Sequence, residues 1–226
     1  MQNQNKAQKS QIPIAVIGVS CRLPGQISTP DEFWRFCCQA RSAWSEIPSS
    51  RFSADAYYHP NPDQQGATNT RGGHFLDDVA HFDAAFFEMS AEEAMAADPQ
   101  QRLMLECAYE AIESAGISKA KVAGERVGVF AAGSFSDYEL NNFRDLQNTP
   151  TFQTTGCAAS FLSNRLSHFF DFTGPSLTVD TACSSSLSAL HLACQSLKSG
   201  ESTHALVGGC HLNLTPDYFI SYSLTR

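Results

Sequence analysis

The stretch 174–200 most constrains the fold, because its pattern changes abruptly from that of a strand to that of a helix. A Gly-Pro pair marks a turn at its start, and residues 176–180 then alternate apolar and polar side chains as a short strand does. From Leu187 onward, leucine and cysteine residues recur at the spacing of one helical face, and Gly200 follows them as a helix C-cap does. The stretch therefore predicts a strand, a tight turn and a helix of about four turns.

Cys183 falls on the predicted turn, next to the unpaired N–H groups of the first helical turn. Such a position favours the thiolate form of a cysteine, and the residue's own backbone N–H can point at an oxyanion formed on the group that the sulfur attacks. A buried cysteine with a packing role is the alternative interpretation of any single thiol. The turn makes Cys183 the candidate catalytic nucleophile.

Three more segments have the pattern of strands, at 12–18, 126–133 and 204–209. The first is a continuous apolar run ended by glycine, which is typical of a central strand buried on both faces. Helical patterns lie between the strands, so the chain predicts an α/β fold with a parallel sheet. In such sheets, sites form beyond the carboxyl ends of the strands, where the turn at Cys183 is expected.

Two segments have the chemistry of helix N-termini. Residues 29–32 (Thr-Pro-Asp-Glu) combine a cap, a proline at the first position and a glutamate that can complete a capping box, and residues 98–101 (Asp-Pro-Gln-Gln) follow the same order. The first of these helices is expected to turn Phe33 inward, and the ring of Trp34 is expected in the core rather than at a ligand.

The composition excludes several classes of protein. A chain of 226 residues with 42% hydrophobic residues suits one domain, which we place at 12–226, and residues 1–11 are a polar tail predicted to be disordered. The net charge of −8, without a cluster of Lys and Arg, argues against nucleic-acid and anionic-membrane partners. Eight cysteines without the spacing of a metal site indicate reduced thiols. With no signal-peptide pattern and no long apolar segment, the sequence predicts a cytoplasmic chain.

The run Asp180-Thr-Ala-Cys-Ser-Ser-Ser-Leu closely resembles the active-site segment of the β-ketoacyl synthase (ketosynthase) domains of type I polyketide synthases. The resemblance extends over nearly the whole chain from residue 12, and it is strongest to the fungal-type iterative reducing synthases. The other matching motifs are Val19-Ser-Cys-Arg-Leu-Pro-Gly, Arg71-Gly-Gly-His-Phe-Leu and Asp98-Pro-Gln-Gln-Arg-Leu-Met-Leu-Glu.

The resemblance implies a thiolase-like fold, of which this chain would hold the first βαβαβαβ half only. It implies that Cys183 takes an acyl group from a phosphopantetheine thioester on an acyl carrier protein, with no cofactor bound directly by the domain. In the full domain, the carbanion of a decarboxylated malonyl-carrier thioester then attacks that acyl group. The resemblance also implies a homodimer, formed through the strand 176–180, or an association with other polyketide synthase subunits.

The sequence lacks the family motifs His-Gly-Thr-Gly-Thr and Asn-x-Gly-His, whose histidines assist decarboxylation and condensation in the resembled family. His191 does not replace them, because it lies about two turns, or about 12 Å, beyond Cys183 along the predicted helix. We therefore expect a truncated ketosynthase of polyketide biosynthesis. The alternatives are a non-catalytic relic or interaction module that pairs with a complete synthase, and a free-standing acyl-transferring cysteine enzyme.

The resembled fold covers the helix after Cys183 with its second half. Without that half, we expect an unpaired strand edge at residues 205–209 and an exposed apolar helix face formed by Leu187, Leu190 and Leu197.

Overall fold

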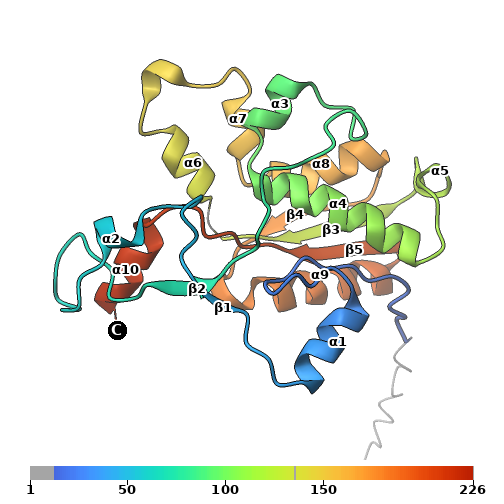
Figure 1. The fold of residues 1–226 in the computed structure, drawn as a ribbon. Coiled ribbons are helices and arrows are strands. Elements are labelled where there is room, and N and C mark those ends of the chain that lie inside the picture. The colour runs from blue at the N-terminus through green and yellow to red at the C-terminus, as the bar shows by residue number, and fades with distance from the viewer. Residues whose placement is uncertain (1–12, 135, 226) are drawn as a thin grey trace, which may run out of the picture.

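A computed structural model describes residues 13–134 and 136–225. Its main sheet contains three parallel strands in the order β4-β3-β5 (Figure 1). These are β3 (Val127–Ala132), β4 (Ser176–Val179) and β5 (His204–Gly209). The predicted parallel α/β sheet is confirmed, and the strands predicted at 126–133, 176–180 and 204–209 are all present. The polar tail predicted at residues 1–11 lies outside the described residues.

Helices and a small second sheet surround the main sheet. The antiparallel pair of the second sheet is β1 (Trp44–Glu46) and β2 (Gly72–His74). The α-helices are α1 (Pro30–Cys38), α2 (Ala54–Tyr57), α3 (Ala91–Ala96), α4 (Pro99–Ser114), α5 (Lys119–Val122), α6 (Asp137–Asn142), α7 (Gln153–Cys157), α8 (Phe161–Phe170), α9 (Ser185–Ser199) and α10 (Asp217–Thr225). Short 3₁₀ turns lie at η1 (Leu146–Asn148) and η2 (Ala182–Ser184).

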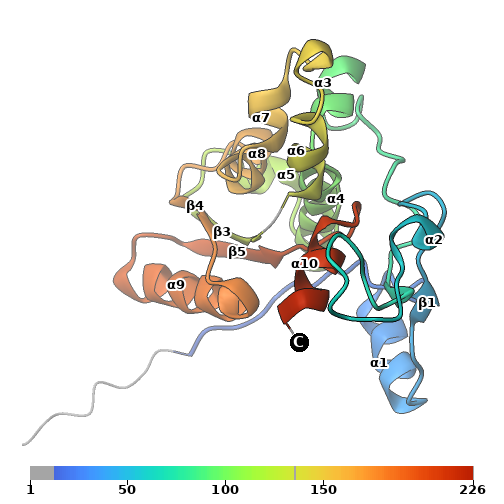
Figure 2. The same ribbon diagram turned by 90° about the vertical axis from the view of Figure 1, so that its left-hand side faces the viewer.

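The strand β3 lies at the centre of the fold and is buried along its whole length. Its alternate side chains point to opposite faces, as a strand requires. Val129 joins the larger core beneath α4 and α8, whereas Phe130 joins a smaller core beneath α9. Figure 2 shows this three-layer arrangement, with α9 on one face of the sheet and α4 and α8 on the other.

Small side chains, and not leucines, bring α9 onto the sheet. The buried positions of this helix are Ser185, Ala189, Ala193 and Ser196. Leu187 is 73% exposed, and Leu190 is also exposed, so the apolar face recognised in the sequence points away from the sheet. Leu197 is only half-buried. The expected exposure of this face is therefore confirmed at Leu187 and Leu190.

The strand predicted at residues 12–18 is not formed by its described residues, 13–18. This segment is extended but unpaired, and Val16 is 79% exposed. It lies along the C-terminal half of α4. A Cβ atom on Gly18 would clash with the backbone carbonyl of Ala111, and the Ser20 hydroxyl donates a hydrogen bond to Cys107 O at 2.6 Å. The apolar run has the chemistry of a buried strand, but it pairs with no described strand.

Both predicted helix N-termini are confirmed. At α1, Thr29 and Glu32 form a complete capping box, and at α4 the Asp98 carboxylate accepts a hydrogen bond from Gln100 N. The prediction that α1 buries its aromatic face is wrong, because no residue of α1 is fully buried and Trp34 is 70% exposed. Capping is set by local chemistry. Burial depends on neighbouring elements, and α1 has none that covers it in the described chain.

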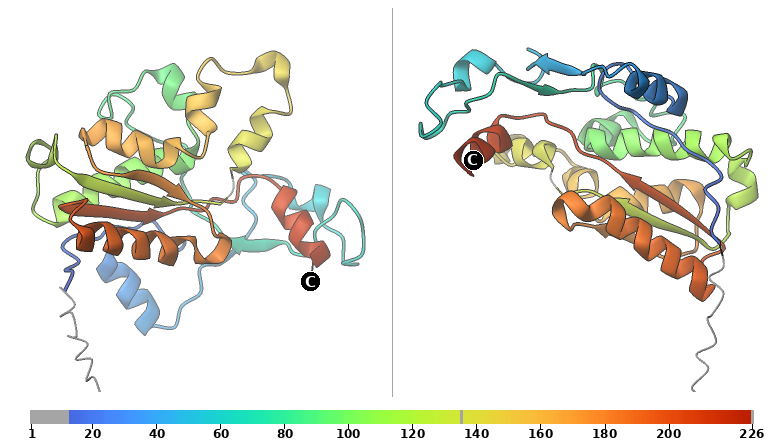
Figure 3. Two further views of the ribbon diagram at one scale, coloured as in Figure 1. Left: turned by 180° about the vertical axis from the view of Figure 1, so that it is seen from behind. Right: turned by 90° about the horizontal axis from the view of Figure 1, so that it is seen from below.

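The long segment between α1 and α3 has little regular structure but has a small core of its own. Ile47, Phe52 and Phe75 are buried together, and the ring of Phe219 from α10 stacks on Phe75 at a centroid distance of 6.1 Å. Figure 3 shows α10 beside this segment, at one end of the molecule. The C-terminal helix is thereby fixed to a region more than a hundred residues earlier in the chain.

We predict opposite effects for two substitutions on α9. Ala189→Leu adds volume where the helix touches the sheet, and we expect the free energy of unfolding to fall by about 2 kcal/mol. Leu187→Ala removes an exposed side chain, and we expect a change within about 0.5 kcal/mol. Chemical denaturation of both variants measures these effects. A larger loss for Leu187→Ala than for Ala189→Leu would contradict the assignment of the two faces.

Candidate functional site

Cys183 lies in the 3₁₀ turn η2, which joins the end of β4 to the start of α9. Its side chain is exposed. The preceding residue, Ala182, has a φ of +55°, in the left-handed region that a residue with a Cβ atom rarely adopts. The chain thus leaves the strand through one strained residue and presents the thiol immediately before a 15-residue helix.

Hydrogen bonds hold this strained turn on both sides of the cysteine. Asp180 Oδ1 accepts from the N–H of Ala182 at 2.9 Å and from the Ser134 hydroxyl at 2.9 Å. These two donors hold the pKa of the Asp180 carboxyl below its ordinary value. On the helix side, the Ser185 hydroxyl accepts from Thr181 N at 2.8 Å and donates to Ala182 O at 2.7 Å. The turn is therefore defined by its own side chains as well as by its backbone.

The three parallel strands end at one edge of the sheet, next to this turn. Ala132 of β3 lies opposite both Val179 of β4 and Gly209 of β5. Helices approach the end of β5 closely from both faces. A Cβ atom on Gly208 would lie 2.6 Å from Met104 Sδ of α4, and one on Gly209 would lie 2.5 Å from Ser186 Oγ of α9. The first turn of α9 therefore touches the carboxyl end of β5, where the sequence predicted the site.

The other cysteines differ from Cys183 in burial or position. Burial raises the pKa of Cys107 and of Cys157 to about 11 each and that of Cys210 to about 12, and it also raises the pKa of Cys21. The cysteines that are exposed besides Cys183 are Cys37 and Cys38, at the C-terminal end of α1. Backbone N–H groups that stabilise a negative charge lie at a helix N-terminus, not at its C-terminus.

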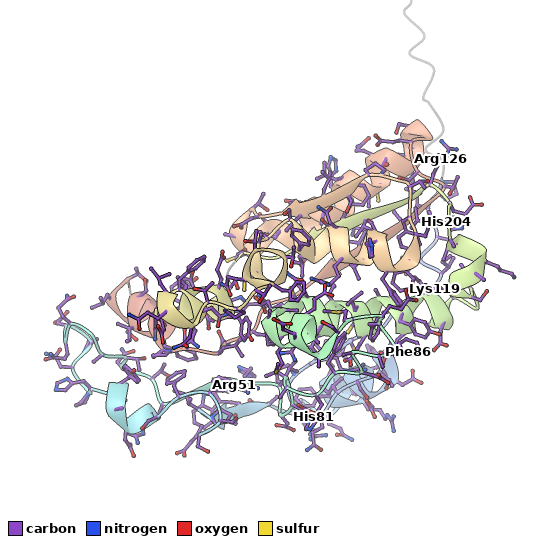
Figure 4. The ribbon with its side chains drawn as sticks, turned by 90° about the horizontal axis from the view of Figure 1, so that it is seen from above. Arg51, His81, Phe86, Lys119, Arg126 and His204 are labelled. Atoms are coloured by element: carbon purple, nitrogen blue, oxygen red, sulfur yellow. The ribbon has the colours of Figure 1, made fainter. Side chains whose placement is uncertain are left out.

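No hydrogen bond among the described residues joins Cys183 to a histidine. His191 is exposed on α9, two turns further along. His204 is the first residue of β5 and lies near Arg126, at the opposite end of the parallel sheet from the turn (Figure 4). His81 pairs with Asp78 at 2.6 Å in the long segment before α3. The histidine predicted to be too far to serve as a base, His191, is indeed separated from the thiol by the length of the helix between them.

The described residues contain no group of three or more His, Cys, Asp or Glu side chains arranged to hold a metal ion. An open pocket of about 590 Å³ lies elsewhere, between the segment that contains Arg22 and Ile27 and the segment that contains Leu76 and Phe82. Neither Cys183 nor any other residue of its turn lines this pocket. In the described part of the chain, no helix is both long and apolar enough to cross a membrane.

Sequence reasoning identified Cys183 but missed the residues that hold its turn. An aspartate directly after a strand, two residues before an alanine, is a signal for a side chain that bonds to the backbone two positions on, and it could have indicated Asp180. Ser134 offered no such signal, because it precedes Asp180 by 46 positions and meets it only through the pairing of β3 with β4.

A family model described as the N-terminal domain of β-ketoacyl synthases matches residues 11–226. The chain belongs to the β-ketoacyl synthase family. It is 55% identical over 221 residues to highly-reducing polyketide synthase 1 of Aureobasidium melanogenum. The aligned region covers 97% of this chain and 10% of that protein. It is 48% identical over 224 residues to the squalestatin tetraketide synthase of Phoma sp. strain C2932. That aligned region covers 99% of this chain and 9% of that protein.

Solved structures agree with this family. A ketosynthase domain of the oxazolomycin synthase of Streptomyces albus JA3453 matches with a TM-score of 0.86 and 34% identity, over 93% of this chain and 37% of that one. A ketosynthase of the bacillaene synthase from Bacillus subtilis 168, solved as a cysteine-to-serine mutant, matches with a TM-score of 0.83 and 34% identity, over 93% of this chain and 34% of that one. The thiolase-like fold and the relation to polyketide synthases are confirmed. This β-ketoacyl synthase chain spans about a tenth of the curated relatives and about a third of the solved chains.

We predict that Cys183 reacts fastest of the eight cysteines in the folded chain at neutral pH. Cys107, Cys157 and Cys210 are protected by burial and by a raised pKa, and Cys37 and Cys38 lie at the wrong end of a helix. Limiting iodoacetamide followed by peptide mass spectrometry ranks the thiols. Labelling of Cys37 or Cys38 at the same rate as Cys183 would show that exposure alone determines reactivity.

Proposed function

We propose that this chain is the nucleophile-bearing part of a polyketide synthase ketosynthase, with Cys183 as the acyl acceptor. The observation that supports the proposal is an exposed thiol on a strained turn that hydrogen bonds hold in place. This turn lies at the carboxyl edge of a parallel sheet and at the start of α9. A nucleophile needs access and a fixed position, and the N-terminus of a helix supplies backbone N–H groups for a developing negative charge.

In the proposed reaction, the substrate is an acyl group held as a thioester on the phosphopantetheine arm of an acyl carrier protein. The Cys183 thiolate attacks the thioester carbonyl, and a tetrahedral oxyanion forms. Collapse of that intermediate forms the Cys183 thioester and breaks the bond to the phosphopantetheine sulfur, which leaves as a thiolate and takes up a proton. No bound cofactor is needed, because the substrate and the product are both thioesters and have similar free energies of hydrolysis.

Carbon–carbon bond formation needs more than this turn. Decarboxylation of a malonyl thioester and attack of the resulting carbanion require general acid–base groups. Each such group typically raises the reaction rate about 10²–10⁴-fold. No described histidine is hydrogen-bonded to Cys183, and the sequence lacks the two histidine motifs of the family. We therefore propose that condensation requires the second half of a ketosynthase domain. The eight free thiols favour a reducing compartment, and the proposed site of action is the cytoplasm.

The proposed partners are an acyl carrier protein and a second synthase subunit or copy of this chain. The outer edge of β4 and the outer edge of β5 are both unpaired in the described part of the chain. A sheet with two open edges is a template for strand pairing with another chain. Pairing through β4 would place Cys183 close to the interface, because the turn follows that strand directly.

A second candidate function, an interaction module without catalysis, is favoured by the outer face of α9. Leu187 and Leu190 are both exposed on this face. Exposed apolar surface of this kind marks contact sites between proteins. The two candidates differ in one requirement, since binding through α9 does not need the Cys183 sulfur and acyl transfer does.

We predict that the chain acquires one acyl group from a short acyl-pantetheine thioester, and that Cys183→Ala abolishes this gain. The matched control is Cys38→Ala, which removes another exposed thiol and should acylate like the parent chain. Intact-protein mass spectrometry counts the groups, and peptide mapping locates them. Equal acylation of Cys183→Ala and the parent chain would exclude Cys183 as the acceptor and leave the interaction module as the better candidate.

We further predict that the chain alone releases no CO₂ from a malonyl-carrier thioester. The reason is that the acid–base groups described above are missing from the surroundings of Cys183. Release of labelled CO₂ from carboxyl-labelled substrate is the measurement, with a complete ketosynthase as the positive control. Release above that of a Cys183→Ala control would mean that residues of this chain supply the missing acid–base chemistry.

A further inference from the structure

The segment that follows β3 bonds to three different elements around the nucleophile turn. Ser134 donates to Asp180 Oδ1 at 2.9 Å, and Ser136 donates to Asp98 Oδ2 at 2.6 Å. Asp137 Oδ2 accepts from the backbone N–H groups of Leu214 and Thr215, at 2.8 and 3.0 Å. This short segment therefore connects the turn at Cys183, the start of α4 and the chain that leaves β5.

The first of these bonds differs from the other two in its surroundings. Asp98 is 3% exposed and Asp137 is 4% exposed, so the bonds they accept satisfy carboxylates that water cannot reach. Removing a donor from a buried carboxylate destabilises the whole fold. Asp180 is exposed, and water can replace the Ser134 hydroxyl there at little cost in stability. The Ser134 bond is therefore not needed to keep the chain folded.

What the Ser134 bond fixes is the position of the turn. Asp180 Oδ1 is shared between the Ser134 hydroxyl and the N–H of Ala182. Through this one oxygen, the strained residue before Cys183 is tied to the end of the neighbouring strand β3. Water in place of Ser134 would solvate Asp180 but would not define the distance between the two strand ends.

We propose that Ser134 is a positioning residue for Cys183, acting through the Asp180 carboxylate. The inference rests on the proposed function for its meaning in acyl transfer, but not for its effect on the thiol. The Ser134 hydroxyl donates to Asp180 and so acts on the turn, not on the sulfur. It holds Ala182 in the left-handed conformation and so keeps Cys183 at the start of α9, where a developing oxyanion meets the backbone N–H groups.

The test uses the double-mutant cycle of Ser134→Ala and Asp180→Ala, in the full chain. Ser134→Ala should lower the rate constant for iodoacetamide alkylation of Cys183 about fivefold, the effect expected for the loss of one hydrogen bond. Asp180→Ala removes the acceptor of both bonds and should lower this rate constant at least as much. The double variant should be no slower than Asp180→Ala alone, because the two residues act on one path. Alkylation of Cys37 and Cys38 in the same samples serves as the internal control and should not change.

Two further variants separate positioning from folding. Ser199→Ala removes a hydroxyl at the far end of α9 and should leave the rate at Cys183 unchanged. Ser136→Ala should lower the thermal midpoint, whereas Ser134→Ala should retain the midpoint of the parent chain. With an acyl-pantetheine thioester, Ser134→Ala should lower the acylation rate constant about fivefold and leave the half-saturating concentration of the thioester unchanged.

The proposal is overturned if Ser134→Ala alkylates at the parental rate, if the two single effects add in the double variant, or if the midpoint of Ser134→Ala falls as far as that of Ser136→Ala. These results are distinct from failure of the proposed function. A parent chain that is alkylated at Cys183 but never acylated would refute the acyl-transfer proposal. The alkylation rate constants of the two single variants and the double variant would still test the positioning role of Ser134.

Discussion

The close packing of α9 against the sheet is the constraint on which the candidate site depends. Alanine and serine at the four buried positions of α9 let the helix backbone approach β3 and β5, while Phe130 fills the space between them. Larger side chains would move the helix axis away from the strands. The far end is held as well, by a bond of 2.8 Å between the hydroxyls of Ser196 and Ser202. With both ends fixed, the N-terminus of α9 can meet the sheet only at its carboxyl edge.

The turn at Cys183 follows from that constraint. The chain must leave β4 and enter a helix on one face of the same sheet within a few residues, and the left-handed Ala182 makes this change of direction. A left-handed residue with a Cβ atom costs about 1–2 kcal/mol. Several hydrogen bonds of about 1 kcal/mol each offset that cost, from Asp180 on one side and from Ser185 on the other. The hydrogen bonds thereby hold Ala182 in its strained conformation, and this conformation defines the position of Cys183.

Features set by neighbouring residues could be predicted from the sequence. The helix N-caps, the strand at 204–209 and the turn at Cys183 depend on residues within a few positions of one another, so their chemistry is visible in the chain. The burial of particular faces could not be predicted from periodicity alone. Trp34 of α1 and the apolar run at 13–18 have the pattern of core elements, yet Trp34 and Val16 are exposed. Periodicity identifies an apolar face, but the elements that cover it decide whether that face is buried.

The outer face of α9 also connects assembly with chemistry. Leu187 lies in the first turn of α9, which directly follows the 3₁₀ turn that contains Cys183. A protein surface that covers Leu187 therefore lies at the same end of α9 as the thiol. Exclusion of water from that space strengthens the interaction between an oxyanion and the N–H groups at the start of α9, because charges and dipoles interact more strongly where water is absent. The surface that the lone chain exposes and the nucleophile that it presents are thus adjacent, and a partner that buries the first changes the surroundings of the second.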